Sequence, residues 1–523
     1  MLLTIAKKRS RKGSRQVVQK ASGRFQPRVQ QVGPEHFALV CVDCAKARSC
    51  WMLADYYGRI IIAPKNVAHN RVELDAMVAE IQRACSEHDL RDCIVAVERT
   101  GRYHRPVQQA CMAAKLETRV VHPFATKQQR QPADPGNKTD VTDLMAIHRA
   151  AVNGFALAEM PLSEADRRFQ LLCRHRRDWV RKNSILCCQI REHLEAAYPG
   201  YAACFDKFWE SELAWTLLRQ LETPEAIRKA GSKGLAELLI HHKIRYQKRS
   251  LDKVVQWAAS AAAGEVAAHV HRRIALDLNK DRLGKTTEIK GLEREIAHLL
   301  VQTPYILLLS IPGVNVVSAS EYGGELGPIT HYANSRCITG RAGLYPSRYQ
   351  SDQVDHANGP LVRCCNRRMR AVILGIADNL IRCNKHFQQL ATGWAAAGKD
   401  PRISHVKVGL RFTRMSYQIV AGRQLCRHPA MRQTSYVLDK LLAFHREHET
   451  PLRETMTDLQ LAIAQLPSKY HQDEAKPFKE EFDRIDRCRS RKPELLGDII
   501  LEVLQRLGVN VIKSSASGDS PQT

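Results

Sequence analysis

The chain has 523 residues, and its 80 Lys and Arg against 54 Asp and Glu give a formal net charge of +26. With 44% hydrophobic and 26% charged residues it has the composition of a globular protein of about three or four structural units, which excludes an intrinsically disordered chain. No apolar run approaches the roughly 18 residues of a membrane helix, so we expect a cytoplasmic protein with no membrane partner.

The positive charge favours a polyanionic partner, because a surplus of this size repels itself in isolation. Nucleic acid is the leading partner class, and a lipid surface is the weaker alternative. The 16 Cys lack the regular spacing of a disulfide framework, which indicates reduced thiols. Cys41 and Cys44 form a CxxC pair, but both lie in an apolar strand pattern with no second pair nearby, so a zinc site is not favoured.

The N-terminal third predicts a basic arm followed by an α/β domain. Residues 1–34 hold nine Lys or Arg and no acid, which predicts a disordered arm. The region 35–155 then alternates between strand and helix patterns, which predicts an α/β domain whose first three strands form an antiparallel meander. The predicted strands cover 37–43, 50–55, 58–63, 93–98 and 118–122, and the predicted helices cover 69–87, 103–115 and 139–152.

The remaining two thirds are mainly helical in pattern. Residues 156–304 repeat apolar positions at three-four spacing, which predicts long coiled-coil helices that pack on each other or on a second subunit. A further unit covers 305–390, a basic helical extension covers 391–512, and a disordered tail covers 513–523.

The extension includes a stretch with nucleic-acid character. Residues 401–438 contain seven Lys or Arg and no acid, with Phe412, Tyr417 and Tyr436 interleaved. Basic residues mixed with aromatic ones are typical of nucleic-acid surfaces. Ordinary packing explains the aromatic residues equally well.

Four acids are candidates for a metal centre. Asp43 ends the first predicted strand and Glu98 the fourth, so their carboxylates meet at one sheet edge if those strands are neighbours. Asp140 and Asp143 lie three residues apart near a helix start, hence on one face. Converging acids repel unless a cation joins them, and oxygen ligands favour Mg²⁺ or Mn²⁺, the ions of two-metal phosphoryl transfer. Singly, each acid is explained as well by a turn or by a helix N-terminus.

Three segments carry a family resemblance. VCVDCAK (40–46), AVERTGRYHRPV (96–107) and NKTDVTDLMAIHRA (137–150) resemble the DEDD insertion-sequence transposases, the group typified by the Piv invertase and the MooV transposase. The resemblance implies an RNase H-like, RuvC-like domain whose catalytic, metal-binding acids are Asp43, Glu98, Asp140 and Asp143. We expect the neighbouring basic residues to bind nucleic acid: Lys46, Arg99 and Lys138.

Later segments are similar to the mainly α C-terminal transposase domain of the same family. They are LLLSIPGVNVVSASEYGGELG (307–327), GRAGLYPSRYQSDQ (340–353) and NGPLVRCCNRRMRAVI (358–373). Residues 311–315 predict a helix-hairpin-helix-like turn that aims N–H groups near Gly313 and Asn315 at a phosphate, with Asn315 in the left-handed conformation where the family has glycine. A purely structural turn is the alternative.

The resemblance also implies a nucleophilic serine, which maps to Ser351, with Ser335 and Ser347 as alternatives. Asp352 stands where the family usually has glycine. A serine hydroxyl is a weak nucleophile, so we expect the metal held by the four acids to activate it in a composite centre. The arginines predicted on the following helix are expected to bind phosphate: Arg363, Arg367, Arg368 and Arg370.

Three functions remain open at this point. The first, implied by the resemblance, is a prokaryotic DNA recombinase acting at the nucleoid, which excises and inserts its element through a phosphoserine ester. It would work with donor and target DNA, a structured noncoding bridge RNA as guide, and a dimer that assembles into a tetramer. The second is a metal-dependent RuvC-like nuclease or Holliday-junction resolvase with water as nucleophile. The third is a nucleic-acid-binding protein without catalysis.

Overall fold

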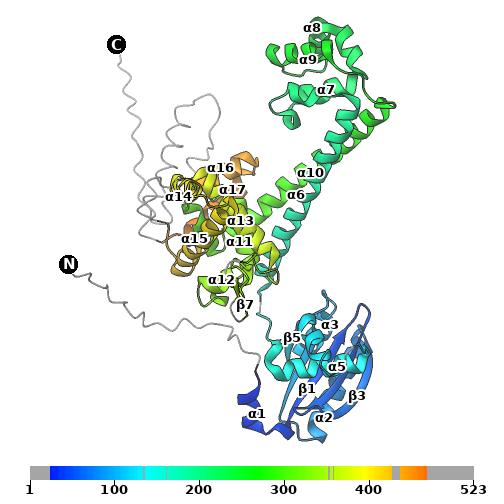
Figure 1. Ribbon diagram of the computed structural model, residues 1–523, viewed down its shortest axis with the longest axis vertical. Coiled ribbons are helices and arrows are strands. Elements are labelled where there is room, and N and C mark those ends of the chain that lie inside the picture. Colours follow the sequence, from blue (N-terminus) through cyan, green and yellow to red (C-terminus); the bar gives the residue numbers. More distant parts are fainter. Residues whose placement is uncertain are drawn as a thin grey trace, which may run out of the picture. The chain divides into compact units, whose positions relative to one another are not determined.

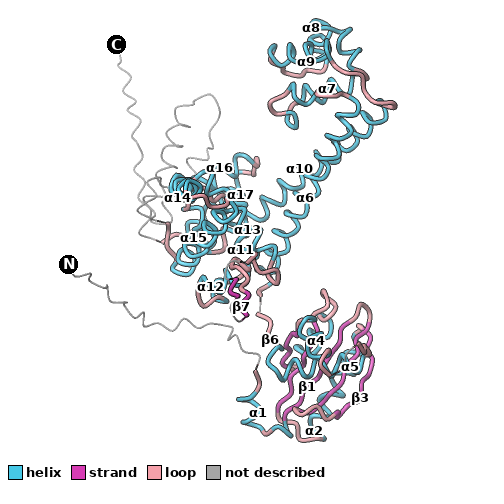
Figure 2. Tube along the Cα trace, viewed as in Figure 1, coloured by secondary structure: helices cyan, strands magenta, loops and turns pink. Residues whose placement is uncertain are grey.

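The structure is a computed structural model that describes residues 24–133, 136–160, 162–351, 354–356, 359–426 and 436–467. The chain divides into two compact units (Figures 1 and 2). One comprises the residues up to Pro161 with the short segment 330–333, and the other comprises Leu162–Ile329 and the residues from Asn334 onward. Within the described part, no helix combines the length and the apolar character needed to cross a membrane.

The first unit is built on a six-stranded mixed sheet in the order β3-β2-β1-β4-β5-β6. The strands are β1 (Phe37–Cys44), β2 (Arg48–Asp55), β3 (Ile60–Ala68), β4 (Asp92–Glu98), β5 (Glu117–Val121) and β6 (Ala156–Leu157). The first three pair antiparallel, which confirms the predicted meander, while β1, β4 and β5 run parallel. This order is consistent with an RNase H-like domain. Because β6 pairs with β5, the sheet extends past the predicted boundary at 155.

Both faces of the sheet are covered by helices. Alternate residues of β1 enter two different cores, with Cys41 in one and Cys44 in the other. Helices α2 (Arg71–Glu87) and α3 (Arg105–Ala113) pack into the core that contains Cys44. Helix α5 (Asp140–Ala150) packs into the core that contains Cys41. Since the two cysteines face opposite sides of the sheet, the alternation also argues against a shared zinc site.

The predicted disordered arm ends earlier than residue 34. Residues 1–23 lie outside the described residues, but helix α1 (Gln26–Val32) is ordered against the sheet unit. Phe25 is fully buried and its ring lies 5.7 Å from that of Phe37. Arg28 forms ion pairs with Asp92 and Glu117, both at 2.5 Å. The arm prediction was wrong from Phe25 onward because Phe25 is buried and Arg28 pairs with acids far away in the sequence.

The second unit begins with a long helical hairpin, as the three-four spacing predicted. Helices α6 (Glu164–Ala197) and α10 (Ala268–Leu300) lie side by side along their length in Figure 1. Side-chain hydrogen bonds between the two helices, such as Arg168–Glu295 and His193–His271, show that they run antiparallel. The loop between them holds α7 (Glu212–Gln220), α8 (Pro224–His241) and α9 (Lys248–Ser260), which share an aromatic core around Tyr201 and Trp215.

The helices after residue 304 complete the same unit. They are the 3-10 helix η5 (Pro304–Ser310), α11 (Val316–Leu326), α12 (Ser335–Ala342), α13 (Arg367–Cys383), α14 (Lys385–Ala396), α15 (Pro401–Gly422), α16 (Val437–Glu447) and α17 (Leu452–Gln465), with a small hairpin of β7 (Tyr349–Ser351) and β8 (Val354–His356). Helix α11 packs on α6 and α10, and the predicted boundary at 390 falls inside α14. The regions predicted as 156–304, 305–390 and the start of the extension pack together in this one compact unit, and the tail at 513–523 lies outside the described residues.

Candidate functional site

Two of the predicted acids come together because of strand register. Strands β1 and β4 are parallel neighbours, and Val42 is paired with Val97, so Asp43 and Glu98 follow at the same sheet edge. Side chains alternate along a strand. Asp43 therefore shares the face of Cys41, and Glu98 shares the face of Ala96, which is the face that α5 covers.

The other two acids come from the first turn of α5. Thr139 caps this helix: its hydroxyl accepts from Thr142 N at 3.2 Å, and Thr139 N donates to Thr142 Oγ1 at 2.9 Å. The helix therefore starts at Asp140, which is exposed, and carries Asp143, which is buried, on the same side. The positive end of the helix dipole favours both carboxylates.

The carboxylates of the four acids interact electrostatically. Burial raises the pKa of Asp43, and the charges of Asp143 and Asp140 raise it further. Burial also raises the pKa of Glu98, with the charge of Asp43 adding to the effect. The part of these shifts that comes from the neighbouring carboxylates arises because like charges at short range disfavour ionisation. The four acids predicted from the sequence thus form one cluster, which we call the carboxylate cluster.

The carboxylate cluster contains a cation that sequence reasoning missed. Helix α4 (Pro123–Arg130), which was not predicted, places the Arg130 guanidinium in an ion pair with Asp143. Their side chains are only 15% and 8% exposed. In the described part of the chain, no group of three or more His, Cys, Asp or Glu side chains is arranged to hold a metal ion. The signal available in the sequence was Arg130, which stands shortly before Asp140 and Asp143.

The donor set of the cluster nevertheless fits a hard divalent ion. All four groups are carboxylate oxygens, which Mg²⁺ and Mn²⁺ prefer. Burial and the neighbouring acids raise the pKa of Asp43 and of Glu98 although Lys138, and for Asp43 also Arg130, act in the opposite direction. Lys46, Arg99 and Lys138, predicted to bind nucleic acid, are exposed and form no ion pair within the described residues.

Ser351 lies in the other unit. It is the last residue of β7 and pairs with Val354 of β8, so it ends a short strand where the sequence predicted a loop. Its side chain is exposed, and the described residues provide no base hydrogen-bonded to it, while Asp352 lies outside them. Of the alternatives, Ser347 donates to the carbonyl of Pro360 at 2.9 Å, and Ser335 begins α12.

The four arginines after Ser351 differ in their surroundings. Arg363 lies in a bend ahead of α13, not on the helix as expected, and both it and Arg367 are exposed. Arg368 pairs with Asp178 of α6 at 3.3 Å. Arg370 is not a free phosphate ligand, because its guanidinium donates to the carbonyls of Ala342 at 2.9 Å and Gly343 at 3.0 Å, and to that of Val362.

The predicted phosphate-binding turn has a different geometry from the one expected. Gly313 has a positive φ of 96°, but Asn315 is extended at φ −113° and serves as the N-cap of α11, accepting from Ser318 N at 2.8 Å. Asn315 therefore works as a helix cap, not as a glycine substitute. The Lys440 amine donates to the carbonyls of Leu309, Ile311 and Val314 at 2.7–2.9 Å, which ties α16 to the turn.

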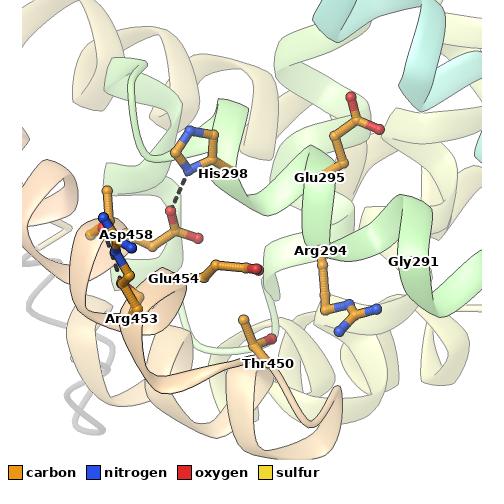
Figure 3. A pocket seen from close by; sticks show the side chains of 9 residues that line it. Gly291, Arg294, Glu295, His298, Thr450, Arg453, Glu454 and Asp458 are labelled. Atoms are coloured by element: carbon orange, nitrogen blue, oxygen red, sulfur yellow. Dashed lines mark hydrogen bonds and ion pairs between the residues drawn. The ribbon is translucent and has the colours of Figure 1, made fainter.

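Two cavities in this unit have charged linings. A groove of about 400 Å³ at the start of α11 is lined by Arg176, Arg177 and Arg382, and Arg176 and Arg382 pair with acids in its wall. The second cavity, of about 490 Å³, lies between α10 and α17 (Figure 3). In it, His298 Nδ1 and Asp458 Oδ1 are hydrogen-bonded at 2.6 Å. Its basic and acidic side chains are balanced, so it does not select an anion.

Known proteins with similar sequences share these regions. Residues 40–199 match a transposase family of the DEDD, IS110 kind, and residues 305–392 match the transposase IS116/IS110/IS902 family. An uncharacterized 44.8 kDa protein of insertion element IS116 from Streptomyces clavuligerus is 25% identical over 241 residues, which is 45% of this chain and 60% of the relative. The first matched region contains the carboxylate cluster, and the second contains Gly313, Ser351 and the arginines that follow.

Proposed function

The chain belongs to the insertion-sequence transposases of the IS110/IS116 type, and from this membership we propose that it excises and inserts its own DNA element by cutting and rejoining DNA strands. The observation that carries the proposal is the carboxylate cluster at one edge of an RNase H-like sheet. Acids gathered in a basic protein of charge +26 are suited to a metal and a phosphate at once.

The proposed metal site is RuvC-like and uses Asp43, Glu98, Asp140 and Asp143. Bound Mg²⁺ would neutralise charge that develops on the scissile phosphate and would lower the pKa of an attacking hydroxyl. The capped start of α5 fixes the two aspartates one turn apart, and the pairing of β1 with β4 fixes the other two acids. Lys46, Arg99 and Lys138 would hold the backbone of the nucleic acid beside them.

Ser351 is the proposed nucleophile. Its Oγ would bond to the phosphorus as the P–O bond to the leaving strand breaks, and the proton lost by the serine would balance the one gained by the leaving oxygen. Attack by the hydroxyl of the other strand would then break the Oγ–P bond and restore the serine. Each of these two steps forms one phosphodiester linkage as it breaks another, so rejoining needs no external energy source.

The proposal extends to the partners. A structured bridge RNA that pairs with donor and target DNA would supply sequence recognition, which agrees with a protein rich in charge for backbone contacts. Exchange of strands at two sites needs several active centres, so we include a dimer that assembles into a tetramer. RNA that copurifies with the protein can be sequenced, and preparations without any such RNA would contradict this part of the proposal.

The chemistry is tested with end-labelled element DNA, Mg²⁺ and the copurified RNA, followed by denaturing electrophoresis with and without protease. We expect wild-type protein to give a protease-sensitive covalent adduct and a recombinant product. Ser351→Ala should give neither, whereas Ser347→Ala, the matched control in the same segment, should give both. Normal recombination by Ser351→Ala would refute the serine mechanism.

A second candidate is a RuvC-like nuclease or junction resolvase in which water attacks. The exposed position of Ser351, with no hydrogen-bonded base among the described residues, favours it. It predicts that Ser351→Ala still cleaves and that no adduct forms. The recombinase and the nuclease both predict that Asp43→Asn loses cleavage. A binding protein without catalysis predicts that the wild-type protein does not cleave DNA at all.

A further inference from the structure

The surface formed by α14 and α15 carries positive charge that the fold does not neutralise. From Lys385 to Gly422 the sequence has a single acid, Asp400. Asp400 is used locally, since its carboxylate caps α15 by accepting from Arg402 N at 2.7 Å. The same segment has six basic residues: Lys385, Lys399, Arg402, Lys407, Arg411 and Arg414.

Two of these cations are gathered on one indole ring. The Lys407 amine lies 5.0 Å and the Arg411 guanidinium 5.3 Å from the centroid of the Trp394 ring. The amines of Lys399 and Lys407 are also close enough to hydrogen-bond, and this contact lowers the pKa of Lys407. Within the described residues, neither Lys399, Lys407 nor Arg411 has a carboxylate partner. Packing the core does not explain the arrangement, because Phe387 is the one buried residue of α14.

The cations form a row on the outer side of α15. Lys407, Arg411 and Arg414 follow at spacings of four and three residues, so they lie on one face and span about 10 Å of the helix. The opposite face is buried and includes Phe412, whose ring packs 5.0 Å from that of Tyr322. Phe412, which the sequence suggested as part of a nucleic-acid surface, is therefore a core residue, and Trp394 is the aromatic residue on the basic side.

We propose that this surface, made of Lys399, Lys407, Arg411 and Arg414 around Trp394, binds the phosphate backbone of duplex DNA. A row about 10 Å long can face three successive phosphates of one strand, which are about 3.4 Å apart along the axis. The ring of Trp394 already holds two cations. It is therefore not an open platform on which an unpaired base can stack, as surfaces for single strands require.

All five residues of this surface lie after residue 392, beyond the region that matches the family. The inference does not depend on the carboxylate cluster or on Ser351, because it concerns binding alone. It identifies a role for the first part of the basic extension: holding DNA by charge, independently of sequence.

The test measures how salt weakens binding of the full-length protein to a labelled duplex of random sequence, from about 50 to 200 mM salt. Each phosphate contact contributes about 0.9 to the slope of log K against log salt, so Lys407→Gln/Arg411→Gln should reduce the slope by about 1.8. The matched control is Lys207→Gln/Lys253→Gln, which removes the same charge at lysines that pair with Glu210 at 3.6 Å and Asp206 at 3.3 Å. Its slope should stay at the wild-type value.

Thermal unfolding separates binding from a structural role. Because like charges are removed, Lys407→Gln/Arg411→Gln should melt at or above the wild-type temperature. An unchanged salt slope would overturn the proposal, as would an equal loss of slope in the control variant. A loss of slope with single-stranded RNA but not with the duplex would assign the surface to RNA and also overturn it. A clearly lower melting temperature would show that the cations serve the fold.

Discussion

Arg130 is the residue whose replacement tests the carboxylate cluster most directly. Arg130→Met removes the cation from Asp143, and both side chains of the pair are at least 85% buried, being 15% and 8% exposed. Breaking a buried ion pair from one side costs about 3–5 kcal/mol, and here the stranded carboxylate also faces the charge of Asp43. For a domain of this size that corresponds to a fall in melting temperature of roughly 10–15 °C.

The assay is thermal unfolding of wild type and Arg130→Met in EDTA and in saturating Mg²⁺. We expect the large deficit in EDTA and a much smaller one in Mg²⁺, because a bound ion supplies the positive charge that the guanidinium supplied. Arg99→Met removes an exposed arginine directly after Glu98 and should change stability by about 0.5 kcal/mol or less in either condition.

Two results would refute this reasoning. Equal melting temperatures of wild type and Arg130→Met in EDTA would show that Asp143 does not depend on Arg130. A deficit of the same size in EDTA and in Mg²⁺ would show that no metal ion replaces the guanidinium, and it would count against the proposed metal site.

Three further predictions concern packing and pH. Lys440→Met removes the amine that donates to three carbonyls before α11, of which Ile311 O still accepts from Val314 N, and should cost about 3 kcal/mol in urea unfolding, whereas an unchanged midpoint would contradict the contacts. Burial lowers the pKa of His448, but the hydrogen bonds to Glu293 and to the Phe444 carbonyl, with the charge of Glu293, together outweigh burial and raise the pKa overall. The stabilisation is therefore complete below about pH 6.5 and is lost as pH rises through the raised pKa. His448→Gln should therefore lose more stability at about pH 5.5 than at pH 8.5, and a pH-independent loss would exclude the ionic contribution. Phe25→Ala should cost about 3–5 kcal/mol by calorimetry, while no effect would restore the disordered arm up to residue 34.

Local pattern was enough to predict five of the six strands and the positions of the acids on them. The short apolar runs around Asp43 and Glu98 determine where β1 and β4 end, and the three-residue spacing of Asp140 and Asp143 determines that they share a helix face. These features depend on residues close together in the chain, because strand alternation and helix periodicity are set by the nearest neighbours. The motifs around the same acids, with those in the second unit, were also enough to identify the family.

Side-chain partners far apart in the sequence could not be predicted in this way. Arg370 looks like a phosphate ligand in the sequence, but carbonyls 27 and 28 residues away occupy its guanidinium. Arg28 looks like part of a free arm, but Asp92 is 64 residues away and holds it in place. A basic residue in a sequence has the same appearance whether its partner is nucleic acid or a distant acid.

The sequence alone determined the charge of +26, the succession of strands along the chain and the acids at or next to their ends. Only the tertiary structure decided which cations are already neutralised and which remain available, such as Lys407 and Arg411 around Trp394. It also decided that Arg130 occupies the carboxylate cluster. The physical reason is that an ion pair depends on distance in space, and the fold brings together charges that the chain separates.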